Sequence, residues 1–195
     1  MMKMNKILYI IDNNEKKDYK YNINEDTIIY HFSINSSSNV LINLEKEDIT
    51  LYYYYSDINY DDNYFNITVN HLKSNTHSEV FNHGVNVGDS HLDFRVDGVV
   101  LKESDGCICN QDNQIINISN GKSTIRPNLL IDNYNVDSNH AAYIGKFKDD
   151  IMFYLMSRGI SKKRCYDLLI NGFLISSDSI DTNKITEFID CINRI

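Results

Sequence analysis

Short apolar segments separated by polar clusters follow one another along residues 1–147. The apolar segments are rich in β-branched and aromatic residues, as β-strands prefer, and several alternate with a period of two. They lie at 7–11, 27–32, 40–42, 49–55, 65–69, 92–96 and 116–118. Between them, polar stretches such as 35–39 and 57–63 have the composition of turns. Because no helical period of 3.6 runs through 64–145, this part of the chain is predicted to be β-structure.

Many short strands with turns roughly every 8–12 residues favour a sandwich, a barrel or a β-solenoid. Periodicity does not choose among the three, and no self-similar repeat of the kind that marks a solenoid is visible. The run of four tyrosines at 52–55 fits one strand with two rings on each face, with a stacking platform as the alternative.

The pattern becomes helical after residue 147. Asp149 and Asp150 suit the first turn of an amphipathic helix, and Gly159 suits the position just after its end. Ser161 is a candidate N-cap for a second helix, which Gly172 is expected to end.

A third helix over about 182–194 would place Ile185, Phe188, Ile189 and Ile192 on one face. The chain therefore divides into a β-rich region, residues 1–147, and a small helical region, residues 148–195.

Composition narrows the function classes. The chain has 195 residues, a net charge of −8 and 42 % apolar residues, which permits a packed core but argues against a general nucleic-acid binder. Its first apolar run, 7–11, is far shorter than the roughly 18 residues of a membrane span. Four cysteines are too few for a disulfide scaffold. We therefore expect a cytoplasmic protein with reduced thiols, no membrane and no nucleic-acid partner.

Two sets of side chains could carry metal chemistry. Cys107 and Cys109 would lie on one face of a strand, either as ligands of a soft metal or as buried apolar thiols. The histidines could converge on a metal if successive strands stack, or they could simply lie at strand ends. They are His71, His77, His83 and His91.

Four ordered motifs give the chain a more specific signature. They are a Pro-x-Leu strand, a histidine followed by small residues and glycine, the sequence Phe-Tyr-Leu-x-x-Arg-Gly-Ile-Ser, and Ile-x-Gly-Phe. Their positions are 126–131, 136–145, 153–161 and 168–173. Through them, residues 71–174 resemble the SufB/SufD family of the SUF iron–sulfur cluster assembly system.

The resemblance implies a right-handed parallel β-helix core followed by C-terminal helices, with the β-helix placed over about 64–145. Members of this family are scaffolds. SufB and SufD pair through their β-helices, each binds the ABC ATPase SufC through its C-terminal helices, and the cluster is thought to assemble between SufB and SufD. Family members are usually longer, with an N-terminal helical region and more coils.

Two positions point to the SufD type. The SufB type has Glu-His-Glu where this chain has Asn139-His140-Ala141, and a cysteine about one coil earlier, where this chain has Asp112. The resemblance then makes His140 the residue implicated in cluster assembly. Cys107 and Cys109 are candidate accessory thiols without a firm role, because the family's key cysteine aligns elsewhere. The implied ATPase dock consists of Phe153, Tyr154, Leu155, Arg158, Gly159, Leu168, Leu169, Gly172 and Phe173.

These observations predict a shortened SufD-like scaffold subunit that is not itself an enzyme. Its expected partners are a SufC-type ATPase and a SufB-like subunit or a second copy of itself. The expected cargo is a transient iron–sulfur cluster, without a tightly bound cofactor. The alternative is an independent metal- or thiol-binding β-solenoid protein.

Overall fold

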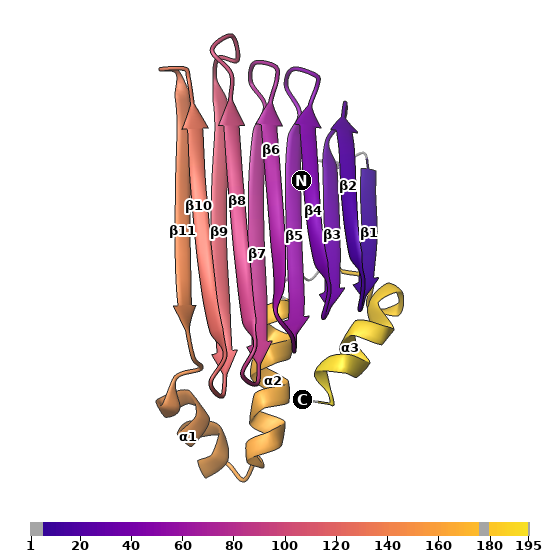
Figure 1. Ribbon diagram of the computed structural model, residues 1–195, viewed down its shortest axis with the longest axis vertical. Helices are drawn as coiled ribbons and strands as arrows, with labels where there is room; N and C mark the ends of the chain where they lie inside the picture. The colour runs from indigo at the N-terminus through magenta and orange to yellow at the C-terminus, as the bar shows by residue number, and fades with distance from the viewer. Residues whose placement is uncertain (1–5, 176–179, 195) are drawn as a thin grey trace.

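The computed structural model describes residues 6–175 and 180–194, and the described chain runs through eleven strands before its helices (Figure 1). The strands are β1 (Lys6–Asn13), β2 (Lys16–Ile23), β3 (Thr27–Ile34), β4 (Ser37–Leu44), β5 (Thr50–Asn59), β6 (Asn63–His71), β7 (His77–Val87), β8 (His91–Val100), β9 (Cys107–Ile118), β10 (Lys122–Ile131) and β11 (Val136–Gly145).

The strands form two stacked parallel sheets. The odd-numbered strands pair in the order β1-β3-β5-β7-β9-β11, the odd sheet, and the even-numbered strands pair as β10-β8-β6-β4-β2, the even sheet. Every one of these pairings is parallel. Each coil therefore adds one strand to each sheet, as a β-solenoid does, which confirms the predicted β-helix and excludes a hairpin-built sandwich or barrel. The solenoid begins at Lys6, well before residue 64.

The coils differ in length, as the spacing of residues paired between successive strands of the odd sheet shows. One interior row along the odd sheet joins a single position from each coil: Leu8, Ile29, Tyr53, Val80, Gln111 and His140. Successive members of this row are 21, 24, 27, 31 and 29 residues apart, counted from the same pairings. Because the coils differ in length, the strands stack regularly although the sequence has no fixed period.

The core lies between the two sheets and contains large aromatic rings. Tyr53 and Tyr55 point inward and are fully buried, and Tyr55 stacks on Phe65 with 3.6 Å between ring centroids. Tyr52 and Tyr54 lie on the outer face of the odd sheet, where both are only partly buried. The tyrosine run is therefore a single strand with two rings on each face, as its alternation predicts.

The interior of the first coils also holds a hydrogen-bonded polar network. The neutral His31 ring donates from Nε2 to Asp12 Oδ2 over 2.8 Å and accepts from the Tyr53 hydroxyl at Nδ1 over 2.7 Å. Burial alone would raise the pKa of Asp12, but hydrogen bonds from His31, Tyr19 and Ser38 outweigh it and hold the value at about 2. Burial lowers the pKa of His31, so the ring stays neutral beside the carboxylate.

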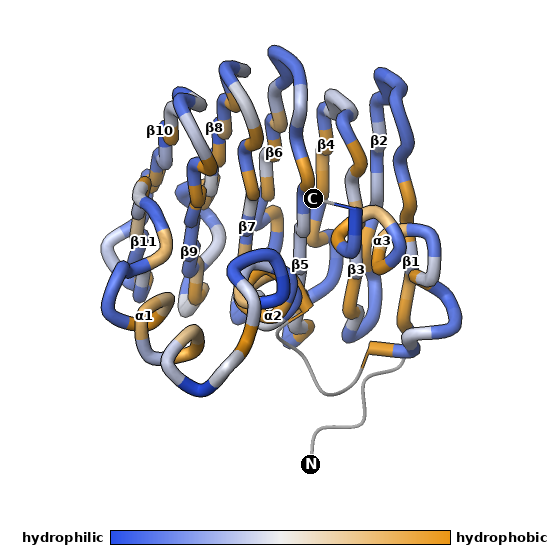
Figure 2. The backbone as a smooth tube through the Cα atoms, turned by 90° about the horizontal axis from the view of Figure 1, so that it is seen from below, coloured by the Kyte–Doolittle hydropathy of each residue, from blue (hydrophilic) through white to orange (hydrophobic). Residues whose placement is uncertain are grey.

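Helices cover the outer face of the odd sheet. They are α1 (Asp149–Ser157), α2 (Lys162–Leu174), a 3-10 turn (Thr182–Ile185) and α3 (Thr186–Ile192). Figure 2 shows α2 and α3 on the side of the odd sheet, and α2 packs on β7 while α3 packs on β3. A second core, separate from the one inside the solenoid, joins the helices to the sheet. None of the helices described is long and apolar enough to cross a membrane.

Two details of the helical prediction were wrong. Gly172 does not end α2, which continues to Leu174 because the last turn is anchored on the odd sheet. There Ser56 Oγ donates to the Leu174 carbonyl over 2.7 Å, and His83 Nδ1 donates to the Phe173 carbonyl over 3.0 Å. The last helix is shorter than 182–194, because its first turn is a 3-10 turn and α3 ends at Ile192. Ser161 does cap α2, accepting from the Arg164 amide.

Candidate functional site

His140 lies on β11, the last strand of the odd sheet, where the solenoid is open. Its position in register with Gln111 continues the interior row, but no further coil among residues 6–175 and 180–194 covers it, and the residue is exposed. Gln111 Oε1, one coil below, is buried and has no hydrogen-bond partner among the described residues. The imidazole therefore stands at the end of a buried row, facing solvent. A neutral imidazole in that place can ligate iron.

The two ends of the solenoid differ in how their edge strands are protected. The N-terminal edges β1 and β2 carry six charged residues in sixteen, namely Lys6, Asp12, Lys16, Lys17, Asp18 and Lys20. The C-terminal edges β10 and β11 carry three in twenty, namely Lys122, Arg126 and Asp137. Charged side chains, lysines above all, discourage an edge strand from pairing with another chain. The end that holds His140 thus carries fewer charges against strand pairing, and Pro127 removes one backbone donor from β10 while β11 contains no proline.

Cys107 and Cys109 lie inside the solenoid, on the same face of β9. Each is 1 % exposed, and Cys107 Sγ lies 3.4 Å from the carbonyl oxygens of Lys73 and Ser104. Burial raises the pKa of the Cys109 thiol to about 11, with Ser78 offsetting part of the shift. Both side chains therefore have the surroundings of buried thiols, and Cys109 is protonated at neutral pH.

Gly98 on β8 makes the space that Cys109 occupies. A Cβ at position 98 would lie 2.5 Å from Cys109 Sγ and 3.0 Å from Gln111 Nε2. We expect Gly98→Ala to lower the free energy of unfolding by about 1–3 kcal/mol, the usual cost of overpacking, measured by urea denaturation. Gly172→Ala is the matched control, because nothing lies within 4 Å of that position and alanine favours a helix by about 1 kcal/mol. Equal losses in the two variants would contradict the steric explanation.

The residues predicted to dock an ATPase divide between the surface and the second core. Phe153 and Tyr154 are 74 % and 57 % exposed on α1, and Leu168 on α2 is 42 % exposed. Arg158, Gly159 and Gly172 are also exposed, whereas Leu155, Leu169 and Phe173 are partly buried. Phe173 stacks on His83, with 4.7 Å between ring centroids. The exposed members offer an unpartnered apolar face on α1.

The other candidate residues do not converge. His71 lies inside the solenoid between Thr76 and Ser78, His83 is held by the end of α2, and His77 pairs with Glu79. His91 lies on the even sheet beside Thr124. Asp112 is in register with Ala141, so it lies on the outer face of β9, opposite to the face of His140. These positions form no common metal centre.

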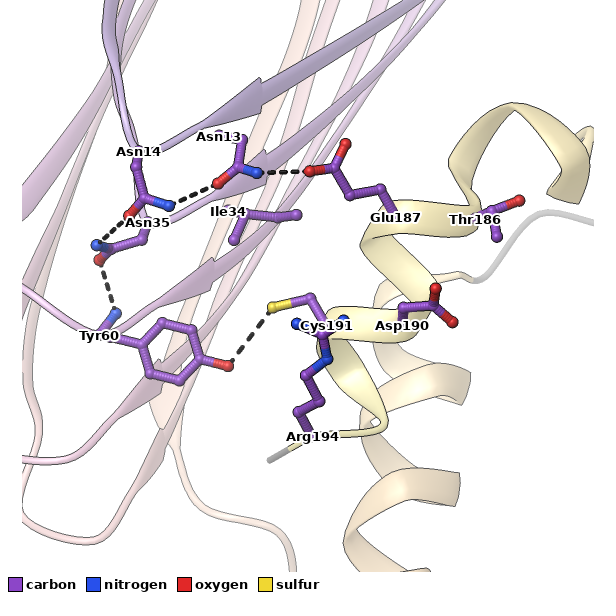
Figure 3. Close-up of a pocket in the computed structure, with 10 residues that line it drawn as sticks. All are labelled: Asn13, Asn14, Ile34, Asn35, Tyr60, Thr186, Glu187, Asp190, Cys191 and Arg194. Atoms are coloured by element: carbon purple, nitrogen blue, oxygen red, sulfur yellow. Dashed lines mark hydrogen bonds between the residues drawn. The ribbon is translucent and has the colours of Figure 1, made fainter.

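A polar pocket of about 600 Å³ lies between α3 and the turns that follow β1, β3 and β5 (Figure 3). Its amide groups bond to one another, as Asn35 Nδ2 does to Asn14 Oδ1 over 2.9 Å. The Tyr60 hydroxyl lies 3.6 Å from Cys191 Sγ across the pocket. The pocket holds none of the residues singled out from the sequence, and we assign it no role in the site.

Sequence reasoning missed the buried acidic groups near the N-terminal end. Asp57 is fully buried on β5, and neither of its carboxyl oxygens has a hydrogen bond of ordinary geometry among the described residues. Burial raises the pKa of Asp57 to about 8. The Ser33 hydroxyl lowers this pKa in part, and the negative charge of Asp12 raises it further. The alternation along the strand was the available signal, because positions 53, 55 and 57 lie on the same face of β5 and Tyr53 and Tyr55 point inward.

A parallel β-solenoid covered on one face by short C-terminal helices is the architectural class to which this chain belongs. Residues 35–173, more than half of the chain, match the family model described as SUF system FeS cluster assembly, SufBD core domain. The chain belongs to this SufBD family.

Three curated relatives have similar sequences over part of their length. The iron–sulfur cluster assembly protein SufD of Bacillus subtilis is 29 % identical over 111 residues, covering 56 % of this chain and 25 % of the relative. SufB of Bacillus subtilis is 29 % identical over 108 residues, covering 53 % and 23 %. A SufBD family protein of Mycobacterium leprae is 33 % identical over 87 residues, covering 44 % and 22 %. The matched part is thus about a quarter of each relative.

Proposed function

We propose that this chain is a SufD-like scaffold subunit for iron–sulfur cluster assembly and is not itself an enzyme. The observation that carries the proposal is His140, an exposed imidazole on the sparsely charged last strand of a solenoid that belongs to the SufBD family. The cluster is its cargo, held transiently at that end. A SufC-type ATPase docks on the α1–α2 hairpin, and the protein works in the cytoplasm.

Pairing with a second solenoid takes place through β10 and β11. These edges carry few charges, so another chain can continue both sheets, with one backbone donor missing at Pro127 of β10. Pairing there covers Tyr143 and Ile144, which are 48 % and 44 % exposed on β11. The partner is a SufB-like subunit, or a second copy of this chain, and in either case His140 lies at the seam.

The SufD type rests on two differences from the SufB pattern. Asn139 and Ala141 flank His140 where the SufB type has glutamates, and Asp112 stands in place of the SufB cysteine. Similarity alone does not separate the types, because SufD and SufB of Bacillus subtilis are equally identical to this chain.

The alternative, a protein that uses Cys107 and Cys109 independently, has less support. A thiol whose pKa is raised to about 11 supplies almost no thiolate at neutral pH, and thiolate is the form that binds metals and reacts. Cys107 is as buried as Cys109, at 1 % exposed, so neither side chain is open to a ligand, and we give both no more than an accessory part.

Replacing His140 with alanine tests the proposal. His140→Ala removes one exposed ring, so we expect stability within about 0.5 kcal/mol of the wild type. In the complex with the ATPase and a SufB-like partner, iron affinity should fall by at least about tenfold, since even outer-shell changes at metal sites cost that much. The measurement is iron and sulfide retained after anaerobic reconstitution.

The matched control is Asn139→Ala, which changes the neighbouring exposed side chain on the opposite face of β11. It should retain the cluster at the wild-type level. Undiminished iron and sulfide in the His140 variant would refute the assigned role, and equal losses in both variants would show that the strand, not the imidazole, matters.

A further inference from the structure

The turn between α1 and α2 and the start of α2 carry a local group of cations, although α1 and α2 together (Asp149–Leu174) have a net charge of only +1, because they also contain Asp149, Asp150 and Asp167. Residues 151–166 contain four cationic residues, Arg158, Lys162, Lys163 and Arg164, and no aspartate or glutamate. The whole chain has a net charge of −8, so the remaining residues together carry −12. Four of the nineteen Lys and Arg residues therefore lie in sixteen positions that hold no acidic residue, within an otherwise acidic chain. Such segregation creates a directed field that orients an approaching partner.

The hairpin carries its cations on the surface. All four of these side chains belong to exposed residues at the turn between α1 and α2 and in the first turn of α2. Arg164 lies 3.8 Å from Asp167, whereas neither Lys162 nor Lys163 takes part in any ion pair among the described residues. α1 and the first part of α2 lie beyond the ends of the odd strands (Figure 1), and residues 157–159 and 161–164 of the turn are exposed. Unpaired cations in a helix's first turn are unfavourable for the helix itself, which argues for a use elsewhere.

An exposed apolar face lies beside the cations. Phe153 is 74 % exposed, and Ile151 and Met156 on the same helix are 43 % and 46 % exposed. The Arg158 guanidinium lies over the Tyr154 ring, 5.2 Å from its centroid, which joins the apolar face to the charged one. Aromatic residues and arginine are the side chains that most often carry binding energy at protein interfaces.

We propose that the α1–α2 hairpin binds an acidic groove with an apolar floor on the ATPase partner. Phe153 and Tyr154 fill the floor, and the cations, Lys162 and Lys163 foremost, face carboxylates along the rim. The occupant is the ATPase of the proposed function, on which this assignment rests; the electrostatic character of its surface is the new element. The charges at the rim set the rate and specificity of association, while the aromatic side chains buried in the groove, Phe153 and Tyr154, set the lifetime of the complex.

The same observations favour a protein over other polyanions. A nucleic acid or an anionic membrane interacts over a wide area, and the −12 carried by the rest of the chain opposes approach to any such extended surface. Four cations around two aromatic side chains match a local acidic groove instead.

The test compares two double charge reversals in the full chain, with the SufC-type ATPase of the same genome as the probe. Lys162→Glu with Lys163→Glu changes the hairpin. Lys16→Glu with Lys20→Glu makes the same change in charge on exposed residues of β2 and serves as the control. At 50 mM salt we expect the hairpin variant to bind at least tenfold more weakly, mostly through a slower association rate, and the control within twofold of wild type. Wild-type affinity should also fall as salt rises to 500 mM.

Phe153→Ala distinguishes the proposed acidic groove from the docking of the ATPase on the hairpin. If Phe153→Ala abolishes binding while the hairpin charge reversal and salt have no effect, the dock stands and the acidic groove is refuted. If neither variant affects binding, docking on the hairpin is refuted as well. Recruitment of the wild-type chain to vesicles of phosphatidylserine and phosphatidylcholine, lost in the hairpin variant but not in the control, would show that the cations serve a membrane and would overturn the assignment.

Discussion

Asp57→Asn is expected to remove a pH dependence from the stability of the fold. The carboxyl group has a pKa of about 8 in the folded chain, against 3.8 as the ordinary value. Between these two values the unfolded chain releases a proton that the folded chain retains, so the free energy of unfolding falls as pH rises. The loss is on the order of 1.4 kcal/mol per pH unit, or roughly 4 kcal/mol by pH 7. Asparagine does not ionise, so the variant escapes this loss.

The measurement is urea denaturation at several pH values between 5 and 8. We expect the stability of Asp57→Asn relative to wild type to increase steadily across this range. The buried amide hydrogens of asparagine lower the variant's free energy of unfolding by an amount that does not depend on pH, so they leave this slope unchanged. Asp132→Asn, at an exposed position after β10, is the control and should leave the slope unchanged. Parallel stability curves for wild type and Asp57→Asn would show that Asp57 is ionised in the folded protein.

The burial of Asp57 illustrates what the sequence could predict and what it could not. Alternation along β5 correctly divides the tyrosine run between the two faces, and the same alternation sends Asp57 inward. Inward positions of such a strand are usually apolar, so a carboxyl group is not expected there. Its burial becomes evident only once Ser33 and Gly84 are known to be the neighbours of Asp57 in register. Register between coils of unequal length is a tertiary property, which no local pattern contains.

The candidate site was predictable to a similar extent. The family motifs locate His140 and the hairpin residues by their order in the chain. They do not reveal that His140 lies at an uncovered end, because this depends on β11 being the last strand of its sheet. Nor do they separate the exposed Phe153 from the partly buried Phe173, since both are aromatic residues in helices and only the packing of α2 on β7 distinguishes them.

The helical region has two roles that act on different faces. Its inward side closes the odd sheet, joining Phe188, Ile185 and Ile192 to the outer face of β3 and β5. Its outward side, the α1 face and the hairpin cations, remains free for a partner. A deletion of residues 149–195 would therefore uncover a core as well as remove a dock, and point substitutions are needed to separate the two roles.

Phe188→Ala is expected to destabilise the protein by about 3–5 kcal/mol, the usual cost of emptying a fully buried aromatic site. Phe188 on α3 is 0 % exposed, and its ring lies 4.9 Å from that of Phe32 on the outer face of β3. The surrounding side chains come from both a helix and a rigid sheet, so they cannot close the cavity by a small shift. Urea denaturation measures the loss, and Asp190→Ala, an exposed change on the same helix, should remain within about 0.5 kcal/mol of wild type. A loss below about 1 kcal/mol for Phe188→Ala would mean that α3 contributes little to the fold and that the odd sheet is stable without its cover.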